Sequence, residues 1–371
     1  MVRELPLNPL WESLGATLKV ESDWRIPSMF KDFQSEYQAV RKTVGSMDLS
    51  YRGKIEVTGR DRIHFLHRML AGDIQGLGIG TGCYTALLSA AGKVLMDTNL
   101  LVFANSVYLG TEIGNEKRVI ELLGGYIINE DVKLKDVTED FALIALQGPR
   151  SEALAQAIFP GPFPELTKRQ HVNFHIGEAN VTMIRISRTG EWGYHLQIPK
   201  EDARQVVNRI MVVGRLYGLR PVGFGATEIL RIEAGVPRYG VDVTEEVTLP
   251  ETGLDKFAAS ETKGCYPGQE VVARTATYGG PAKKLTGLIF AKGPLPAAGD
   301  KIYSGGEEIG RITSACISPV LDKGIALGYV KKGYFEKSAT VTLKTKQGPL
   351  ESTTTTLPFI PLASTQPSGK L

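Results

Sequence analysis

The stretch Thr189-Gly190-Glu191-Trp192-Gly193-Tyr194-His195-Leu196-Gln197-Ile198 carries the clearest structural signal in the chain. From Trp192 onwards every second residue is large and apolar, as in a strand with one buried face. The two glycines allow a tight turn before this strand. The stretch therefore predicts a turn that presents the carboxylate of Glu191, followed by a half-buried strand.

On the amino-terminal side of this stretch, strands and helices alternate. A strand at 54–58, a helix from Asp61 and two strands within 83–103 are followed by a helix near 115–125 and a strand ending at Gln147. The order strand, helix, strand, strand, helix, strand is the split β-α-β pattern. We therefore expect an α+β fold with ferredoxin-like parts.

On the carboxyl-terminal side, the pattern changes at about residue 283 to short apolar runs separated by glycines, such as Leu285–Phe290 and Ala326–Val330. Such spacing predicts a small all-β barrel. Because 371 residues are too many for one core, we expect three domains. They are a discontinuous core made of 1–50 with about 140–280, a second α+β unit at 51–140, and the barrel at 281–361, followed by a flexible polar tail at 362–371.

The composition is that of an ordinary soluble protein, with 42% apolar and 22% charged residues and a net charge of +3. No basic run resembles a nucleic-acid-binding stripe, so we expect no nucleic-acid partner. Three distant cysteines without a C-x-x-C pair argue against a disulfide framework and a four-cysteine metal site. No apolar run has the length of a signal peptide or a membrane span, and we expect a cytoplasmic protein without membrane contact.

Isolated polar residues in apolar or glycine-rich surroundings are the candidate binding residues. Asp97 interrupts the apolar strand 93–103, so it either faces water at a strand edge or points into a pocket. A carboxylate such as Glu191 can bind the paired N–H donors of an amino-pyrimidinone ring, and a second one can stabilise a proton nearby. Tyr84 and Tyr194 are aromatic candidates for covering the ring. A pterin has these groups, although spacing alone does not select it over another ligand.

The most unusual local sequence is Lys263-Gly264-Cys265-Tyr266-Pro267-Gly268-Gln269-Glu270, which continues to Arg274. Flanking glycines allow close backbone approach, and a neighbouring cation such as Lys263 favours a thiolate. On this hypothesis the stretch is a loop that presents Cys265 for reaction. The alternative is a tight turn in which the cysteine is only a small hydrophobic residue.

Several motifs together resemble the glycine-cleavage T-protein (GcvT) superfamily, over nearly the whole chain from about residue 10 to Pro361. The resemblance implies a three-domain cloverleaf around a central tetrahydrofolate site, with transfer or handling of one-carbon groups. The motifs are Gly190–Tyr194, Leu230–Gly235 with Tyr239–Asp242, and Ile309–Ser314 with Ala326–Val330.

The resemblance also implies roles for single residues. Asp97 falls where T-proteins keep the aspartate essential for aminomethyl transfer, although only the second of their two acids is present in Gly92–Asp97. Glu191 matches the pterin-binding glutamate, Tyr84 an aromatic pocket position, and Arg231 an arginine beside the pocket. The expected folate-binding residues are therefore Tyr84, Asp97, Glu191, Tyr194, Arg231 and Lys263, and the expected catalytic residues are Asp97 and Cys265.

The Lys263–Glu270 stretch departs from T-proteins, which lack the cysteine, and resembles the signature of the YgfZ-type branch. Members of that branch bind folate and support maturation or repair of certain iron–sulfur proteins. The first hypothesis is therefore an accessory protein that binds tetrahydrofolate, or a one-carbon derivative of it, and acts through Cys265 on iron–sulfur client proteins.

Two alternatives stay open. The first is an aminomethyltransferase that transfers a one-carbon unit to tetrahydrofolate from a lipoyl carrier protein, in which Asp97 would stabilise positive charge. A weaker alternative, by analogy of fold, is a folate-dependent demethylase. Whether the chain is an enzyme therefore stays open at this point.

Overall fold

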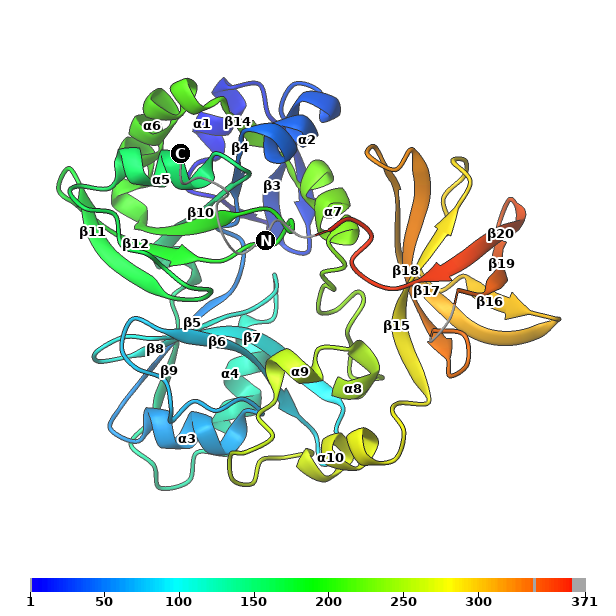
Figure 1. Ribbon diagram of the computed structural model, residues 1–371. Coiled ribbons are helices and arrows are strands. Elements are labelled where there is room, and N and C mark those ends of the chain that lie inside the picture. Colours follow the sequence, from blue (N-terminus) through cyan, green and yellow to red (C-terminus); the bar gives the residue numbers. More distant parts are fainter. Residues whose placement is uncertain (1, 336–337, 362–371) are drawn as a thin grey trace.

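The computed structural model describes residues 2–335 and 338–361, so the predicted tail at 362–371 lies outside the described residues. The described elements form two larger sheets, a closed barrel and a small sheet near the amino terminus (Figure 1). The predicted α+β class and the carboxyl-terminal barrel are confirmed.

The amino-terminal segment forms a small sheet in the order β1-β3-β2 and one longer helix. The carboxylate of Asp32 accepts a hydrogen bond from the Ser35 amide at 2.7 Å and so caps that helix, α2. The elements are β1 (Arg3–Glu4), α1 (Asn8–Ser13), β2 (Thr17–Glu21), β3 (Trp24–Met29) and α2 (Phe33–Lys42).

The five-stranded sheet is antiparallel throughout, in the order β6-β7-β8-β5-β9. Strands β5, β7, β8 and β9 with the two helices make the predicted split β-α-β arrangement, to which β6 adds an edge strand. The elements are β5 (Lys54–Thr58), α3 (Arg62–Met69), β6 (Gly82–Leu88), β7 (Val94–Val102), β8 (Val107–Gly110), α4 (Glu116–Gly124) and β9 (Lys133–Asp136).

The six-stranded sheet, in the order β11-β12-β13-β10-β4-β14, repeats this arrangement with β4 inserted between β10 and β14. Both sheets thus run strand, helix, three strands, helix, strand along the chain. The elements are β4 (Val44–Asp48), β10 (Phe141–Gln147), α5 (Ser151–Ile158), β11 (His171–Ile176), β12 (Ala179–Arg185), β13 (Gly193–Pro199), α6 (Ala203–Gly214) and β14 (Leu219–Val222).

Strand β13 is buried on both faces, which corrects the predicted half-buried strand. The side chains of His195 and Gln197, expected on an open face, are only 5% and 7% exposed. The strand lies inside the sheet, and on the adjacent β10 Ile144 and Ala145 pack into different apolar clusters on opposite faces. Both faces of this sheet are therefore covered.

The chain then passes through α7 (Phe224–Glu233), α8 (Leu249–Thr252), α9 (Asp255–Ala258) and α10 (Gln269–Thr277). The segment around α8 and α9 lies against the five-stranded sheet, where the Val94 amide donates to the Val247 carbonyl at 3.0 Å. The sequence assigned this segment to the discontinuous core, and the domain limits stay a prediction. Residues 269–274, expected in a loop, begin helix α10 instead.

The carboxyl-terminal strands close into a barrel in the order β15-β18-β17-β16-β19-β20. Its interior is filled by aliphatic side chains such as Leu288, Ile302 and Leu343. The strands are β15 (Lys283–Phe290), β16 (Lys301–Ser304), β17 (Glu307–Ser318), β18 (Lys323–Lys331), β19 (Thr340–Thr345) and β20 (Gly348–Thr355).

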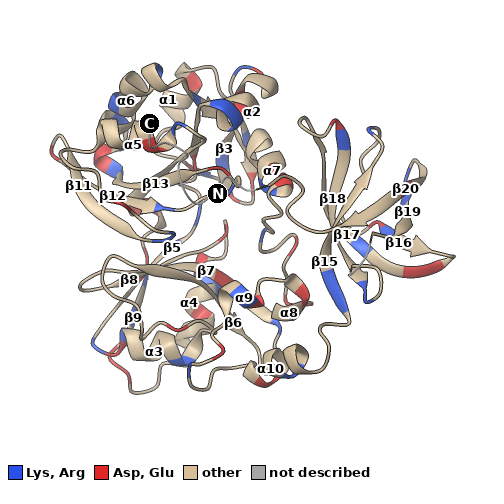
Figure 2. Cartoon of the chain, in the orientation of Figure 1, with Lys and Arg blue, Asp and Glu red and all other residues tan. Residues whose placement is uncertain are grey.

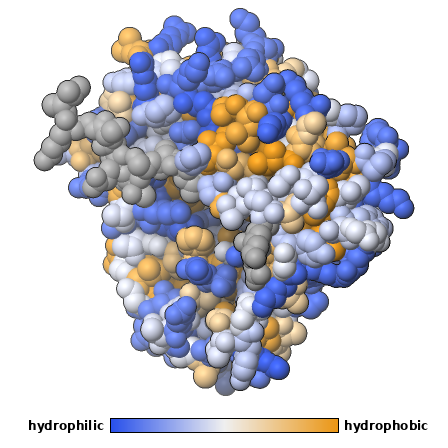
Figure 3. Space-filling model, turned by 45° about the vertical axis from the view of Figure 1, so that its right-hand side comes forward, coloured by the Kyte–Doolittle hydropathy of each residue, from blue (hydrophilic) through white to orange (hydrophobic). Residues whose placement is uncertain are grey.

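Charged residues of both signs are dispersed over all parts of the fold (Figure 2). On the face drawn in Figure 3, hydrophilic side chains surround a smaller group of apolar ones. None of the helices within the described ranges is long and apolar enough to cross a membrane.

Candidate functional site

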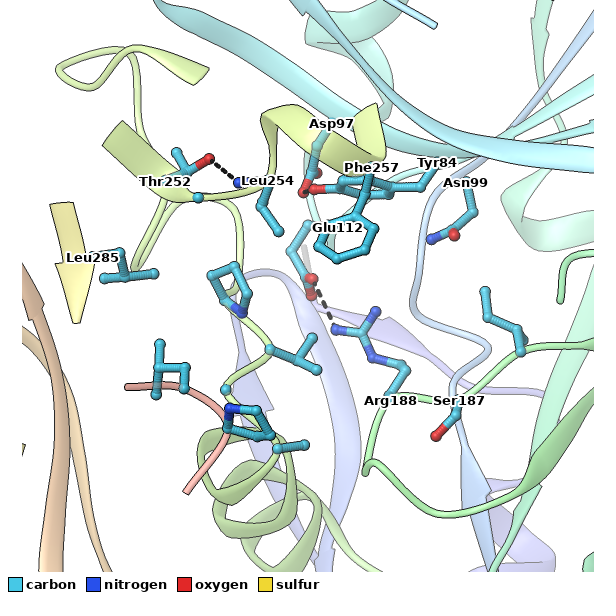
Figure 4. Close-up of a pocket in the computed structure, with 18 of the residues that line it drawn as sticks. Tyr84, Asp97, Asn99, Glu112, Ser187, Arg188, Thr252, Leu254, Phe257 and Leu285 are labelled. Carbon is cyan, nitrogen blue, oxygen red and sulfur yellow. Dashed lines mark hydrogen bonds and ion pairs between the residues drawn. The ribbon is translucent and has the colours of Figure 1, made fainter. Parts of the chain in front are cut away.

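A cavity of about 490 Å³ lies where the two larger sheets and the barrel meet (Figure 4). Its walls come from β6, β7 and β8, from the turn before β13, from α8 and α9, and from β15 and residues 355–358. Cavities of this size hold small molecules. Since both larger sheets, the segment around α8 and α9, and the barrel contribute to its lining, no local stretch of sequence could have revealed it.

Asp97 and Tyr84 point into this cavity from adjacent strands (Figure 4). On β7 the even-numbered residues from Val94 to Leu100 are buried, whereas Leu95, Asp97 and Asn99 are only half-buried on the opposite face. The Tyr84 hydroxyl donates to Oδ2 of Asp97 at 2.7 Å. Of the two hypotheses for Asp97, the pocket is therefore the one that the structure shows.

Burial raises the pKa of Asp97, because the ionised carboxylate loses contact with water. The hydrogen bond from Tyr84 opposes this rise, and the negative charge of Glu112 adds to it. A buried carboxylate with one hydrogen-bond donor can hold a proton or balance a positive charge beside it.

A second carboxylate, Glu112, lies in the cavity between two arginines. Its Oε2 atom is 2.6 Å from Nη1 of Arg52 and 3.4 Å from Nη2 of Arg188. Burial acts to raise the pKa of Glu112, but the two guanidinium groups together lower it to about 2. Glu112 is therefore a permanently ionised group at neutral pH.

Two buried features hold this group in place. Gly53 brings the backbone beside Arg52 against the end of β8, where an added Cβ atom would lie 2.1 Å from Oγ1 of Thr111. The fully buried Gln147 side chain accepts from the backbone amide of Arg188 at 3.1 Å and from the Thr189 hydroxyl at 2.8 Å. Arg52 and Arg188 thus approach Glu112 from backbone positions that are themselves fixed.

The cavity also holds cations without acidic partners. Lys168, Arg169 and Lys284 line it, and none of them pairs with a carboxylate in the described part of the chain. Arg169 is held by Asn99, whose Oδ1 accepts from its Nε at 2.8 Å. Burial and neighbouring positive charge lower the pKa of Lys168. An anionic ligand would neutralise this excess of positive charge.

Glu191 does not line the cavity, which corrects the expectation from the sequence. Its Oε1 accepts from Nη1 of Arg41 on α2 at 2.7 Å. Arg41 also pairs with the fully buried Glu233 on α7, which accepts from the Tyr37 hydroxyl at 2.8 Å. The Glu191 carboxylate therefore ties the turn before β13 to two helices.

Tyr194 and Arg231 also occupy structural positions in place of the ring contacts expected. Tyr194 is 1% exposed and packs with Phe163 in the apolar core of the six-stranded sheet. Arg231 is 3% exposed and donates to Asp242 at 2.5 Å and to Ser314 of β17 at 2.8 Å. It therefore fastens α7 to the barrel.

The Lys263–Glu270 loop lies outside the cavity as well. The Lys263 ammonium donates to the carbonyls of His67, Leu70 and Gly72 and so caps the carboxyl end of α3. Cys265 is exposed, in an open groove of about 390 Å³ that Tyr126 also lines. Lys263, expected to bind folate, and Cys265, expected to be catalytic, therefore both lie apart from the residues that line the cavity.

Reasoning from the sequence missed most of the cavity. Phe257 of α9 lines it beside Tyr84 although its side chain is 67% exposed (Figure 4). Glu112 lies just after β8 and Arg188 just before the Thr189–Ile198 stretch that leads into β13. Neither residue has an unusual local sequence around it. The one feature of the sequence that could have indicated Glu112 and Arg188 as cavity residues is the position of a polar residue just beyond the end of a strand.

Two segments of the chain, which together span most of its length, match models of known protein families. Residues 7–262 match the GCVT N-terminal domain, and residues 283–360 match the glycine cleavage T-protein C-terminal barrel domain. An aminomethyltransferase from Streptomyces avermitilis is 31% identical over 335 residues, which cover 88% of this chain and 89% of that protein. One from Bacillus licheniformis is 29% identical over 363 residues, with coverage of 97% and 99%.

A solved structure agrees with these matches. The crystal structure of glycine cleavage system aminomethyltransferase T from Bartonella henselae has a TM-score of 0.87 and 26% identity to this chain, covering 98% of this chain and 99% of that one. The sheets and barrel described above are thus arranged as in that protein. The chain belongs to the glycine cleavage T-protein family.

Proposed function

We propose that this protein binds tetrahydrofolate in the central cavity and transfers a one-carbon unit there, as an aminomethyltransferase. The observation that carries the proposal is the Tyr84–Asp97 pair, which points into the cavity between the two larger sheets and the barrel. The relatives compared bear the name aminomethyltransferase, which favours this alternative over the accessory function that the sequence suggested first.

The cavity suits such a ligand in size and charge. A volume of about 490 Å³ falls in the range of small-molecule sites. Lys168, Arg169 and Lys284, which have no acidic partner among the described residues, match the carboxylates of a folate tail. The buried Oγ of Ser187 has no hydrogen-bond partner among the described residues and offers a further polar contact.

Asp97 is the residue that we expect to act directly on the reaction. Bound tetrahydrofolate would supply a ring nitrogen that accepts the one-carbon unit. The Asp97 carboxylate would balance positive charge next to that nitrogen, and Tyr84 would keep the carboxylate oriented through its hydrogen bond. The cavity walls would exclude water from the reacting atoms.

The test supplies the purified protein with tetrahydrofolate and an aminomethyl-lipoyl carrier protein. The expected products are methylenetetrahydrofolate and ammonia, formed at a rate that depends on both substrates. Binding of tetrahydrofolate without any turnover of the carrier would exclude the aminomethyltransferase while leaving the folate site in place.

A second candidate function is the folate-dependent support of iron–sulfur proteins through Cys265, as in the YgfZ-type branch. The observation that favours it is the exposed thiol in an open groove outside the cavity. On this proposal Cys265→Ser lowers iron–sulfur enzyme activities in cells and leaves tetrahydrofolate binding intact. Unchanged activities of the iron–sulfur enzymes in cells that carry Cys265→Ser would contradict this second function.

A further inference from the structure

A carboxylate and a guanidinium lie side by side in the cavity, and the proposed role of Asp97 does not use them. Arg52 and Arg188 both donate to Oε2 of Glu112, at 2.6 Å and 3.4 Å. No described residue donates a hydrogen bond to the other oxygen, Oε1. One carboxylate oxygen of Glu112 is thus available in a wall of the cavity.

Arg188 is even less satisfied than Glu112. Its side chain is 14% exposed, and within the described residues its guanidinium makes only the 3.4 Å contact with Glu112. A guanidinium carries five N–H donors, so most of those on Arg188 have no acceptor in the described part of the chain. None of these donors is among the buried polar atoms without a partner in the described residues, so they open onto the cavity that Arg188 lines, where a ligand acceptor can bind them.

We propose that Glu112 and Arg188 together recognise the amide-like edge of the folate ring, with the available Oε1 of Glu112 accepting from both the ring N3–H and the 2-amino group while Arg188 donates to the 4-oxo oxygen. An acceptor beside a donor complements that edge, which carries donors beside an acceptor. Arg52 fixes the carboxylate from behind. This inference rests on the proposed function and assigns ring recognition to Glu112 in place of Glu191.

The other acidic groups are less suited to this task. Glu191 is engaged by Arg41 at 2.7 Å and does not line the cavity. Asp97 accepts from Tyr84, and burial raises its pKa, so it is a poorer fixed anion than Glu112. The two arginines keep Glu112 ionised across the neutral range.

The test measures equilibrium binding of two probes, tetrahydrofolate and its 2-desamino-2-methyl analogue, which lacks the 2-amino donor. The wild-type protein should bind tetrahydrofolate about 10- to 100-fold more tightly than the analogue. Glu112→Gln should reduce this preference to less than about threefold, whereas the matched variant Glu191→Gln should keep it. A change in probe preference reports a ligand contact, which a purely structural role would not alter.

Arg188→Met provides a second arm if Glu112→Gln does not fold, because Arg52 still neutralises Glu112 in that variant. It should weaken tetrahydrofolate binding at least about tenfold. A wild-type protein that binds neither probe contradicts the proposed function itself. Equal binding of both probes, or a preference that survives Glu112→Gln and is lost in Glu191→Gln, overturns this inference and leaves the folate site standing.

Discussion

The central cavity and the Lys263–Glu270 loop both present reactive side chains, but the two regions hold them in different ways. In the cavity, Asp97 and Glu112 are held by hydrogen bonds and ion pairs from other strands and turns. In the loop, Cys265 is exposed and the ammonium of its neighbour Lys263 is used to cap a helix. Chemistry that needs fixed, desolvated groups can therefore take place in the cavity.

The unusual sequence of the loop has mostly structural causes. Tyr266 is buried in an apolar cluster that joins the five-stranded sheet to the barrel. Gly268 has a φ of +78°, and an added Cβ atom would lie 2.5 Å from the Ser89 carbonyl oxygen. Packing and hydrogen bonds thus account for Lys263, Tyr266 and Gly268, whereas they give no reason for the exposed Cys265. A rare local sequence thus reports local packing constraints more reliably than it reports catalysis.

The largest expected effect is that of Asp97→Asn in the cavity. The substitution keeps the size of the side chain and removes its negative charge, so turnover should fall about 10²- to 10³-fold while tetrahydrofolate binding changes less than about threefold. Because burial raises the pKa of Asp97, the acid limb of the wild-type pH–rate profile should lie above the ordinary value of 3.8. Steady-state kinetics as a function of pH measure both effects. If Asp97→Asn turns over at the wild-type rate, the proposal that the reaction takes place in the cavity is contradicted.

The second prediction concerns the stability that Glu112 supplies. Its pKa is lowered from 4.5 to about 2 in the folded protein, so its contribution is present above pH 4.5 and is lost as the pH falls towards 2. The contribution is on the order of 3 kcal/mol. Urea unfolding should show that the difference in free energy of unfolding between wild type and Glu112→Gln becomes smaller as the pH falls from 4.5 towards 2. A difference in free energy of unfolding that does not change with pH would contradict the view that the ion pairs with Arg52 and Arg188 stabilise the folded protein.

The third prediction uses two glycines of the loop as a matched pair. Gly268→Ala should lower the free energy of unfolding by about 2 kcal/mol, because alanine meets both a positive φ and the Ser89 carbonyl. Gly264→Ala, where no atom lies within 4 Å of the added Cβ, should change it by less than about 0.5 kcal/mol. Similar losses in both variants would mean that the loop is packed differently.

The smallest effect is expected for Cys265→Ser. The side chain is exposed, so the free energy of unfolding should change by less than about 0.5 kcal/mol. One-carbon transfer and tetrahydrofolate binding should be unchanged in the purified protein. A loss of transfer comparable to that of Asp97→Asn would place the thiol in the reaction after all.

Much of the fold could be predicted from the sequence, because the apolar periodicity of the strands and the glycine-separated strands of the barrel are local features. Asp97 could be singled out for a similar reason, since a single acid in an apolar strand is conspicuous. Tyr84 was chosen only as one of two aromatic residues that could cover the ring, and its hydrogen bond to Asp97 was not expected. The ion pairs of Glu112 could not be predicted, because they join residues 60 and 76 positions apart. The position of Glu191 outside the cavity could not be predicted either, because Arg41, which pairs with it, lies 150 positions away in the sequence.

The most direct test of the central claim is a crystal structure of the protein with bound tetrahydrofolate. The account predicts density for the ring in the central cavity, with Asp97 beside a ring nitrogen and with Glu112 and Arg188 at the opposite, amide-like edge. Ring density elsewhere, for example in the groove beside Cys265, with an empty central cavity would contradict it.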